Sequence, residues 1–392
     1  MSDILSRIDG DEAFRREQFP CCQGRIFLSH AAVTTLPKVA VDAMNDFNTS
    51  TSTGELDYSE VLLPRMNRVR ASAAKLIECG EDEVALLGPT SLGLSLVANG
   101  IDWKPGDEII TYLDDYPANV YPWKHLEEFG VKVVLLQPEE VGRITPELVE
   151  KAITPNTRLL ALASNHFLAG YRLDIETVSE LARNRDILFC LDAIQTVGAF
   201  PTLAKHVDFL CADSHKWMLG PMTAGIFYVR KERMEDLRPS LVGAWNVKCP
   251  DFIADETVDF EPGGRRYEPG VLNAQGLLGM EASMDLLTSV GIEVVAERLR
   301  MLRGQLISGL TMLGYEVIGP KEGDAVSGIT SCTDRERPDD MAKTYRTLLD
   351  QGIVPSFRHD REGVPYLRFS PHFYNTFSDI DRTLEALRLA RA

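Results

Sequence analysis

Short apolar runs alternate with longer amphipathic segments between about residues 80 and 230. Two of the amphipathic segments, Pro146–Ile153 and Ile175–Asn184, have the periodicity of helices. The strand-like runs are Val84–Leu87, Glu108–Tyr112, Lys132–Leu136, Arg158–Ala163, Ile187–Leu191, Phe209–Cys211 and Gly225–Val229. This alternation predicts an α/β fold with a mostly parallel, seven-stranded sheet covered by helices.

The pattern changes after about residue 255, where a stretch rich in Gly and Pro leads into long helical segments. The later elements are helical patterns at Ala274–Leu287 and Val294–Leu313, strand runs at Tyr315–Ile318, Gly328–Thr330 and Tyr366–Phe369, and a terminal helix from about Asp379. We therefore predict a large domain over residues 21–255 and a smaller α+β domain over residues 256–392. Residues 1–20 are predicted to form an N-terminal segment that packs with the small domain.

Composition narrows the function classes. The formal net charge of −17 argues against a nucleic-acid or anionic-membrane partner, because both need a basic surface. The seven cysteines have no CxxC spacing, which argues against a zinc or other metal site and is typical of a reducing compartment. No signal peptide or membrane span is apparent, so the sequence predicts a soluble cytoplasmic protein.

Polar residues follow several of the predicted strands, at the sheet edge where ligands of such folds bind. The turn Gly88–Gly93 contains Thr90 and Ser91 before a helical pattern, which is typical either of a phosphate cradle or of an ordinary capped turn. Tyr116 follows the second strand and is interpreted as an aromatic face for a ligand or as core packing. Asn165 follows the fourth strand, where it is either functional or a cap.

Two further strand ends carry charge. Asp192 ends an apolar strand, and Lys216 follows it by 24 residues, enough for one helix and one strand. A lysine among apolar neighbours has a lowered pKa, so its neutral amine is available to form a Schiff base. A phosphate cradle, an aromatic face, a carboxylate and an apolar lysine are together what pyridoxal phosphate requires. The motifs GxGxxG and GxxxxGK[ST] of nucleotide enzymes are absent at the strand–helix junctions.

With these residues the chain resembles the class V aminotransferase family of fold-type I pyridoxal-phosphate enzymes, which includes cysteine desulfurases, selenocysteine lyases and isopenicillin N epimerase-like proteins. The most specific stretches are Ser-His-Lys-Trp at 214–217 and Asp-Ala-Ile-Gln at 192–195. The resemblance implies Lys216, Asp192 and Tyr116 as catalytic residues. It implies as cofactor-binding residues Thr90, Ser91, Tyr116, Asn165, Asp192, Gln195, Ser214, His215 and Lys216.

The resemblance also implies a substrate site and an assembly. Arg368 matches the arginine that binds the α-carboxylate of the amino-acid substrate, and Asn165 lies close to that substrate. His30 and Trp245 line the substrate pocket by position, or serve only in packing. The turn Glu268–Gly270 matches one that reaches into the neighbouring subunit's site, which implies a homodimer with shared active sites.

Two positions depart from the desulfurase pattern. Asp213 stands where desulfurases have a phosphate-binding serine; we expect its carboxylate to point away from the phosphate and Ser214 to take that role. Val271 replaces a threonine that desulfurases contribute from the partner subunit.

The reaction is the least determined feature. Desulfurases carry a nucleophilic cysteine shortly before the carboxylate-binding arginine, yet residues 351–360 contain none, and Cys332 lies 36 residues before Arg368. We therefore expect an enzyme that acts through an aldimine and a Cα carbanion, with an aminotransferase ranked first. A desulfurase-like C–S or C–Se lyase, or an epimerase, is the alternative. A non-catalytic regulator that binds pyridoxal phosphate ranks last, because Lys216 is retained.

Overall fold

The computed structural model describes residues 3–55 and 57–391. Its large sheet has the order β2-β8-β7-β6-β5-β3-β4, and β8 is antiparallel to both of its neighbours while the other pairs are parallel. Its strands are β2 (Val84–Leu87), β3 (Glu108–Thr111), β4 (Lys132–Leu135), β5 (Thr157–Ala163), β6 (Leu188–Asp192), β7 (Phe209–Asp213) and β8 (Gly225–Val229). The predicted α/β fold with a mostly parallel, seven-stranded sheet is confirmed.

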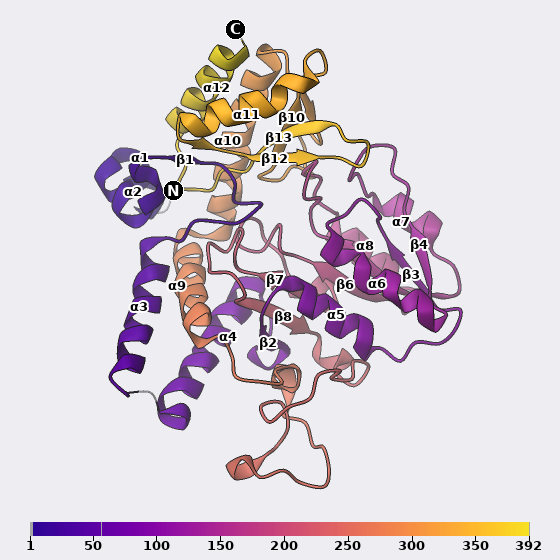
Figure 1. The fold of residues 1–392 in the computed structure, drawn as a ribbon. Helices are drawn as coiled ribbons and strands as arrows, with labels where there is room; N and C mark the ends of the chain where they lie inside the picture. The colour runs from indigo at the N-terminus through magenta and orange to yellow at the C-terminus, as the bar shows by residue number, and fades with distance from the viewer. Residues whose placement is uncertain (1–2, 56, 392) are drawn as a thin grey trace.

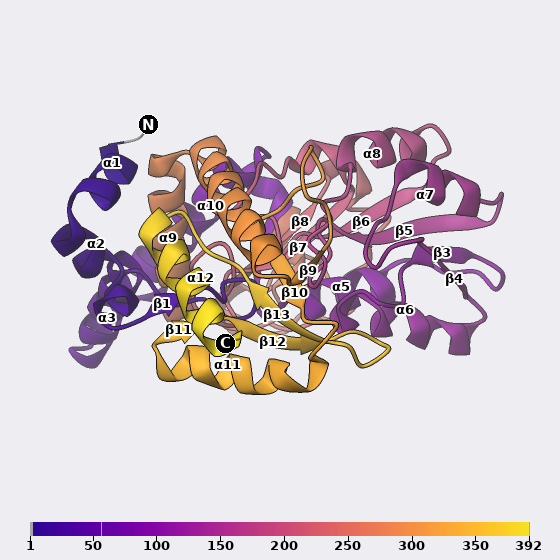
Figure 2. The same ribbon diagram turned by 90° about the horizontal axis from the view of Figure 1, so that it is seen from above.

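Helices cover both faces of this sheet (Figure 2). The helices of the N-terminal half are α1 (Asp3–Gly10), α2 (Glu12–Gln18), α3 (Lys38–Ser52), α4 (Leu63–Ile77), α5 (Thr90–Gly100), α6 (Tyr121–His125), α7 (Pro146–Ala152) and α8 (Ile175–Arg183). Strand β6 shows why both faces need a cover, since Leu188 and Cys190 pack on the α5 side and Phe189 and Leu191 on the α8 side. A strand buried on both faces reads as a continuous apolar run, as the sequence showed.

A second sheet, antiparallel and ordered β12-β13-β10-β9, forms the core of the C-terminal part (Figure 1). The C-terminal elements are α9 (Ala274–Val290), α10 (Ile292–Met312), β9 (Glu316–Ile318), β10 (Thr330–Thr333), α11 (Met341–Asp350), β11 (Ile353–Val354), β12 (Ser356–His359), β13 (Pro365–Phe369) and α12 (Phe377–Arg391). Strand β10 begins two residues later than predicted, and β11 and β12 were not predicted from the sequence. Both are short, and β12 mixes Arg and His with Phe.

The two ends of the chain meet at the small sheet. Strand β1 (Ile26–Phe27) pairs with β11, and the chain continues beside β13 through the Ser29–Ser370 bridge. Before it, Arg15 Nη1 lies 2.8 Å from Asp379 Oδ2, so the N-terminal helices contact the start of α12.

The long helix α9 packs chiefly against α3 and α4, on the side of the large sheet (Figure 1). Glu268, just before it, accepts a hydrogen bond from Leu86 N of β2 at 2.7 Å. Helix α9 therefore packs with elements of the large domain, although it follows the change of sequence pattern near residue 255. The domain limits themselves remain predictions.

None of the helices within residues 3–55 and 57–391 has both the length and the apolar character needed to cross a membrane.

Candidate active site

A cavity of about 280 Å³ lies between the carboxyl edge of the large sheet and the small antiparallel sheet. Its lining comes from the segments after β2, β3, β5, β6 and β7, together with residues 31–33 and two arginines of the small sheet. The side chains that carry its chemistry are Thr90, Ser91, Tyr116, Asp192, Gln195, His215, Lys216, Arg358 and Arg368. The strand order therefore brings most of the predicted site residues together.

Lys216 sits in the turn after β7 and is 5 % exposed. Its Nζ lies 5.0 Å from the centroid of the Tyr116 ring. Burial lowers the pKa of Lys216 to about 8, although the charge of Asp192 acts in the opposite direction. Gly198 lets the chain after β6 approach this turn, because a Cβ at its φ of +92° would lie 2.4 Å from Trp217 O. With this pKa, about half of the amine is neutral, and therefore nucleophilic, at pH 8.

Asp192 is the last residue of β6 and is almost fully buried. Its Oδ1 accepts one hydrogen bond, from Ile194 N at 3.1 Å. Burial raises the pKa of this carboxyl, and the Lys216 charge and the Ile194 amide only partly offset the effect. A second cation, such as a protonated ring nitrogen, would satisfy the carboxylate.

Thr90 and Ser91 are the first two residues of α5 and line the cavity. The first amides of a helix have no intrahelical acceptor, so this end favours an anion. The Thr90 hydroxyl already accepts a hydrogen bond from Asp213 N at 3.0 Å, which ties the helix to the end of β7. The Thr90 hydroxyl keeps its own proton, so the backbone amides and the Thr90 and Ser91 hydroxyls are the donors that this turn can offer to a phosphate.

Asp213 does not line the cavity, as expected from its charge. Its Oδ1 lies 2.8 Å from His215 Nδ1 and accepts from His215 N at 3.2 Å, while Oδ2 accepts from Thr223 N at 3.2 Å. The carboxylate thus spans the base of the turn that carries Lys216. Within that turn Leu219 and Thr223 have left-handed φ angles of 57° and 60°, which are strained for residues with a Cβ.

Gln195 reaches the cavity with its amide already oriented. Its Nε2 donates to Ala31 O at 3.2 Å and its Oε1 accepts from Trp217 Nε1 at 2.8 Å. The second hydrogen of the amide nitrogen is available to a ligand.

Arg368 on β13 is buried, and burial lowers its pKa to about 9. Its Nη1 donates to Phe167 O at 2.7 Å and its Nη2 to Ser356 Oγ at 3.3 Å, whereas the buried Nε has no partner within the described ranges. A buried guanidinium with unused donors is suited to a carboxylate.

Two predicted cofactor residues lie outside the cavity. Ser214 is buried and its hydroxyl donates to Pro221 O at 2.8 Å. The amide nitrogen of Asn165 donates to Gly170 O and Tyr171 O, both at 3.1 Å, and this side chain holds the following loop. In both cases a backbone carbonyl accepts from the polar side chain, and the cofactor roles of Ser214 and Asn165 remain predictions.

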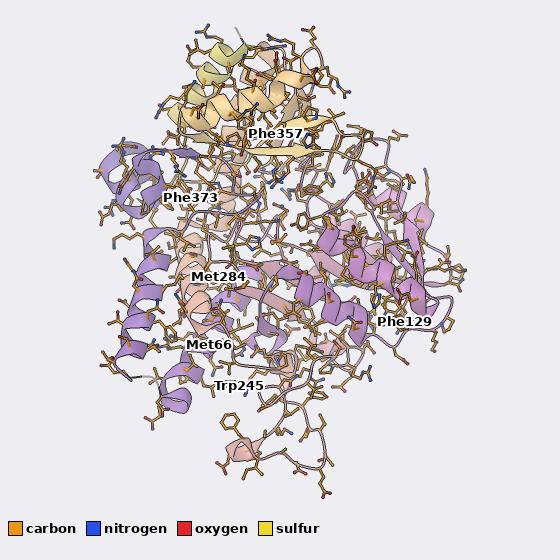
Figure 3. The ribbon with its side chains drawn as sticks, in the orientation of Figure 1. Met66, Phe129, Trp245, Met284, Phe357 and Phe373 are labelled. Atoms are coloured by element: carbon orange, nitrogen blue, oxygen red, sulfur yellow. The ribbon has the colours of Figure 1, made fainter. Side chains whose placement is uncertain are left out.

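The two residues assigned to the substrate pocket by position do not line this cavity of the single chain. His30 is fully buried behind the cavity wall, with Nδ1 2.8 Å from Ser370 O and Nε2 2.8 Å from Tyr374 Oη. Trp245 lies in the long segment between β8 and α9, in the lower half of Figure 3, whereas Phe357 of β12 lies near the top. Neither contributes to the lining.

Sequence reasoning missed Arg358, Phe167 and Asp115. Arg358 and Phe167 line the cavity. Asp115 is buried behind it, accepts from Tyr116 N at 2.7 Å and so fixes the backbone of the aromatic residue. Burial, together with the charge of Asp192, raises the pKa of Asp115 to about 7. The one signal for Asp115 was its place beside Tyr116 after an apolar strand.

The profile of the family described as Aminotransferase class-V matches residues 26–383. The chain belongs to this family. The match confirms the predicted cofactor, pyridoxal phosphate, and makes the protein a pyridoxal-phosphate-dependent enzyme of this family.

Among similar proteins, a probable cysteine desulfurase of Methanothermobacter thermautotrophicus is 26 % identical over 95 % of this chain and 96 % of its own length. The apo cysteine desulfurase of Thermococcus onnurineus has a TM-score of 0.88 at 23 % identity, covering 95 % of this chain and 96 % of its own. The cystine C–S lyase C-DES, solved with its reaction product cysteine persulfide, has a TM-score of 0.84 at 19 % identity, covering 95 % and 99 %. The two structures share the fold.

The side chains fit pyridoxal phosphate. The start of α5 suits its phosphate, the Tyr116 ring offers a flat face, and the under-partnered carboxylate of Asp192 suits a protonated ring nitrogen. Lys216 would supply the amine for the aldehyde.

Proposed function

We propose that this enzyme cleaves a C–S bond of an amino-acid substrate by β-elimination, without forming a persulfide on one of its own cysteines. The observation that carries the proposal is the composition of the cavity, whose described lining includes Lys216 and Arg368 but no cysteine. The relatives named as desulfurases and the C–S lyase of the same fold support the choice of reaction.

The cysteine positions agree with this proposal. The segment from β11 to β13, where desulfurases carry their nucleophile, contains no cysteine. Cys332 is fully buried in β10 among apolar side chains, and burial raises its pKa well above the ordinary value. A buried, protonated thiol is a poor nucleophile.

The roles of the chain's residues follow from their positions. Arg368 holds the substrate α-carboxylate, and Tyr116 and Gln195 limit the movement of the ligand. Lys216 takes the Cα proton, the electron pair left at Cα forms the Cα–Cβ double bond, and the Cβ–S bond breaks as sulfur leaves as an anion. Pyridoxal phosphate, when bound, supplies the electron sink that makes the Cα proton acidic. Asp192 keeps the ring nitrogen protonated.

A product analysis tests the proposal. Purified holoenzyme is given L-cysteine or L-cystine, and the 2-oxo acid, ammonia and sulfide or persulfide are measured over time. Elimination releases the sulfur leaving group and 2-aminoacrylate, which water hydrolyses to oxo acid and ammonia in equal amounts. Oxo acid without ammonia, with the amino group left on the cofactor, would instead support amino transfer, the second candidate, which the family name favours.

We also propose that the enzyme is a homodimer. Val271 is 73 % exposed at the turn after Glu268, and apolar side chains are exposed along the loop before it: Leu241, Val242, Phe252, Ile253 and Val258. Glu268 itself is anchored by Arg70 Nη2 at 2.5 Å, so the turn is presented rigidly. Sedimentation at micromolar concentration should give twice the chain mass. A monomer that retains turnover would contradict the proposal.

A further inference from the structure

The small sheet presents two arginines, not one, to the cavity. Arg358 of β12 is opposite Tyr366 of β13, and Arg368 lies two residues further along β13. Residues two apart on a strand share a face, and directly opposed residues share it too. Both guanidinium-bearing residues therefore stand on one side of the sheet, and both line the cavity.

The positive charge of this pair is not balanced by an acidic side chain. Within the described ranges, Arg358 donates to Phe357 O at 3.2 Å and Arg368 donates to Phe167 O and Ser356 Oγ. No ion pair to a carboxylate is formed by either residue in that part of the chain. Each guanidinium repels the proton of Lys216, and Arg358 lowers the pKa of Arg368. Arg368 is buried and Arg358 is half-buried. Because a charge loses hydration as it is buried, this wall of the cavity favours anionic groups.

One anion is accounted for by the substrate α-carboxylate, which needs one bidentate guanidinium. The phosphate of the cofactor does not account for the other, because its proposed cradle is the start of α5 on the large sheet. Not every arginine of the β12–β13 hairpin faces the cavity. Arg361 lies outside the lining, forms an ion pair with Asp114, and donates from Nη2 to Leu113 O at 3.0 Å.

We propose that Arg358 binds a second anionic group, at the end of the substrate side chain. This inference rests on the proposed function, and it makes the substrate an amino acid whose side chain ends in a carboxylate or in a sulfur oxyanion. Arg368 binds the α-carboxylate, and Arg358 determines which side chain is accepted. An aliphatic or unsubstituted thiol side chain leaves the Arg358 charge without a partner and binds more weakly.

Binding of simple acids to the holoenzyme tests this directly, without turnover. The probes are propionate, which has one carboxylate, succinate, which has two, and 3-sulfopropionate, which has a carboxylate and a sulfur oxyanion. None has an amine, so none reacts with the cofactor. Dissociation constants come from the change in cofactor absorbance or from calorimetry. We expect succinate or 3-sulfopropionate to bind at least tenfold more tightly than propionate, and the tighter of the two identifies the kind of anion.

Variants assign the effect to residues. Arg358→Ala should remove this tenfold preference while leaving propionate within twofold, and Arg358→Gln serves if the alanine variant does not fold. Arg361→Ala is the matched control and should keep the preference. Arg368→Ala should weaken all three probes.

Two results would overturn the inference. One is equal binding of propionate and the di-anions by the wild type. The other is an Arg358 variant that weakens propionate as much as succinate, since both arginines would then hold a single carboxylate. Neither result affects the product analysis that tests C–S cleavage, so the two proposals fail separately.

Discussion

The two walls of the cavity are built in different ways. The wall from the large sheet consists of residues that follow parallel strands, with Asp192 ending β6 and Lys216 following β7. The wall from the small sheet is one face of an antiparallel hairpin, where Arg358 and Arg368 are brought together by strand register. We propose that the first wall binds the cofactor and that the second binds the substrate.

The difference separates common chemistry from selectivity. A parallel sheet fixes all its carboxyl ends at one edge, so groups placed there keep their spacing whatever the loops do. A hairpin changes its exposed face when the register shifts by one residue. We infer that the large-sheet wall provides the chemistry shared by the family, while the small-sheet wall decides which amino acid this enzyme accepts.

The largest effect is expected at Lys216. Replacing it by Ala removes both the amine that holds the cofactor and the base for the Cα proton, so turnover should fall by at least about 10⁴-fold. Borohydride treatment of the wild type should attach the cofactor to Lys216, which peptide mass spectrometry detects. Attachment to another lysine, or full activity of the variant, would remove the assignment of this wall to the cofactor.

Asp192 should come next. Its replacement by Ala leaves Lys216 able to capture the aldehyde but removes the partner of the ring nitrogen, so turnover should fall by about 10³-fold while the protein stays yellow. Absorbance and steady-state rates measure the two effects. Near-normal turnover would mean that the carboxylate only caps the backbone at Ile194, the one hydrogen bond that the structure gives it.

The large-sheet wall could be predicted from the sequence because strand ends can be read from apolar runs. Lys216, Asp192 and Thr90 line the cavity as expected, and so does Gln195, which was assigned through the family resemblance. The direction of the Ser214 hydroxyl could not be predicted from the sequence. In the structure this hydroxyl donates to Pro221 O. That outcome depends on a turn with strained φ angles, which no pattern of apolar residues encodes.

The small-sheet wall was predicted only at Arg368, through the family resemblance. Arg358 lies in β12, a four-residue strand that was not predicted. The spacing of residues in the sequence therefore could not show that Arg358 pairs with Tyr366 across the hairpin. His30 was assigned by its place in the sequence, and it is the neighbouring residues Ala31, Ala32 and Val33 that face the cavity. Which side chain of a short segment faces inward depends on tertiary packing.

The pH dependence of cofactor capture sharpens the picture of Lys216. Its pKa of about 8 is below the ordinary 10.5, so the folded protein holds a neutral amine above pH 8 and an ammonium below it. The rate at which apoprotein captures pyridoxal phosphate should rise about tenfold per pH unit up to pH 8, about a hundredfold from pH 6, and then level off. Stopped-flow absorbance gives the rates. A rise that continues to pH 10 would indicate a solvated lysine and an open wall.

The smallest effect is expected at Cys332, and it bears on the small-sheet wall. Cys332 lies in β10 and pairs with Leu367 of β13, the residue before Arg368. Its thiol nevertheless packs into the hydrophobic core behind the substrate wall. Cys332→Ser should leave turnover within twofold, and its cost should instead be in stability, about 1–3 kcal/mol for a buried hydroxyl. Thermal unfolding and product release measured on the same preparation separate the effect on stability from the effect on turnover.

Cys332→Ala keeps the site apolar and should retain turnover with a smaller loss of stability. Turnover lost in both variants, with a persulfide on the wild-type protein by mass spectrometry, would put a nucleophile in the small sheet and make the enzyme a desulfurase of the persulfide-forming kind.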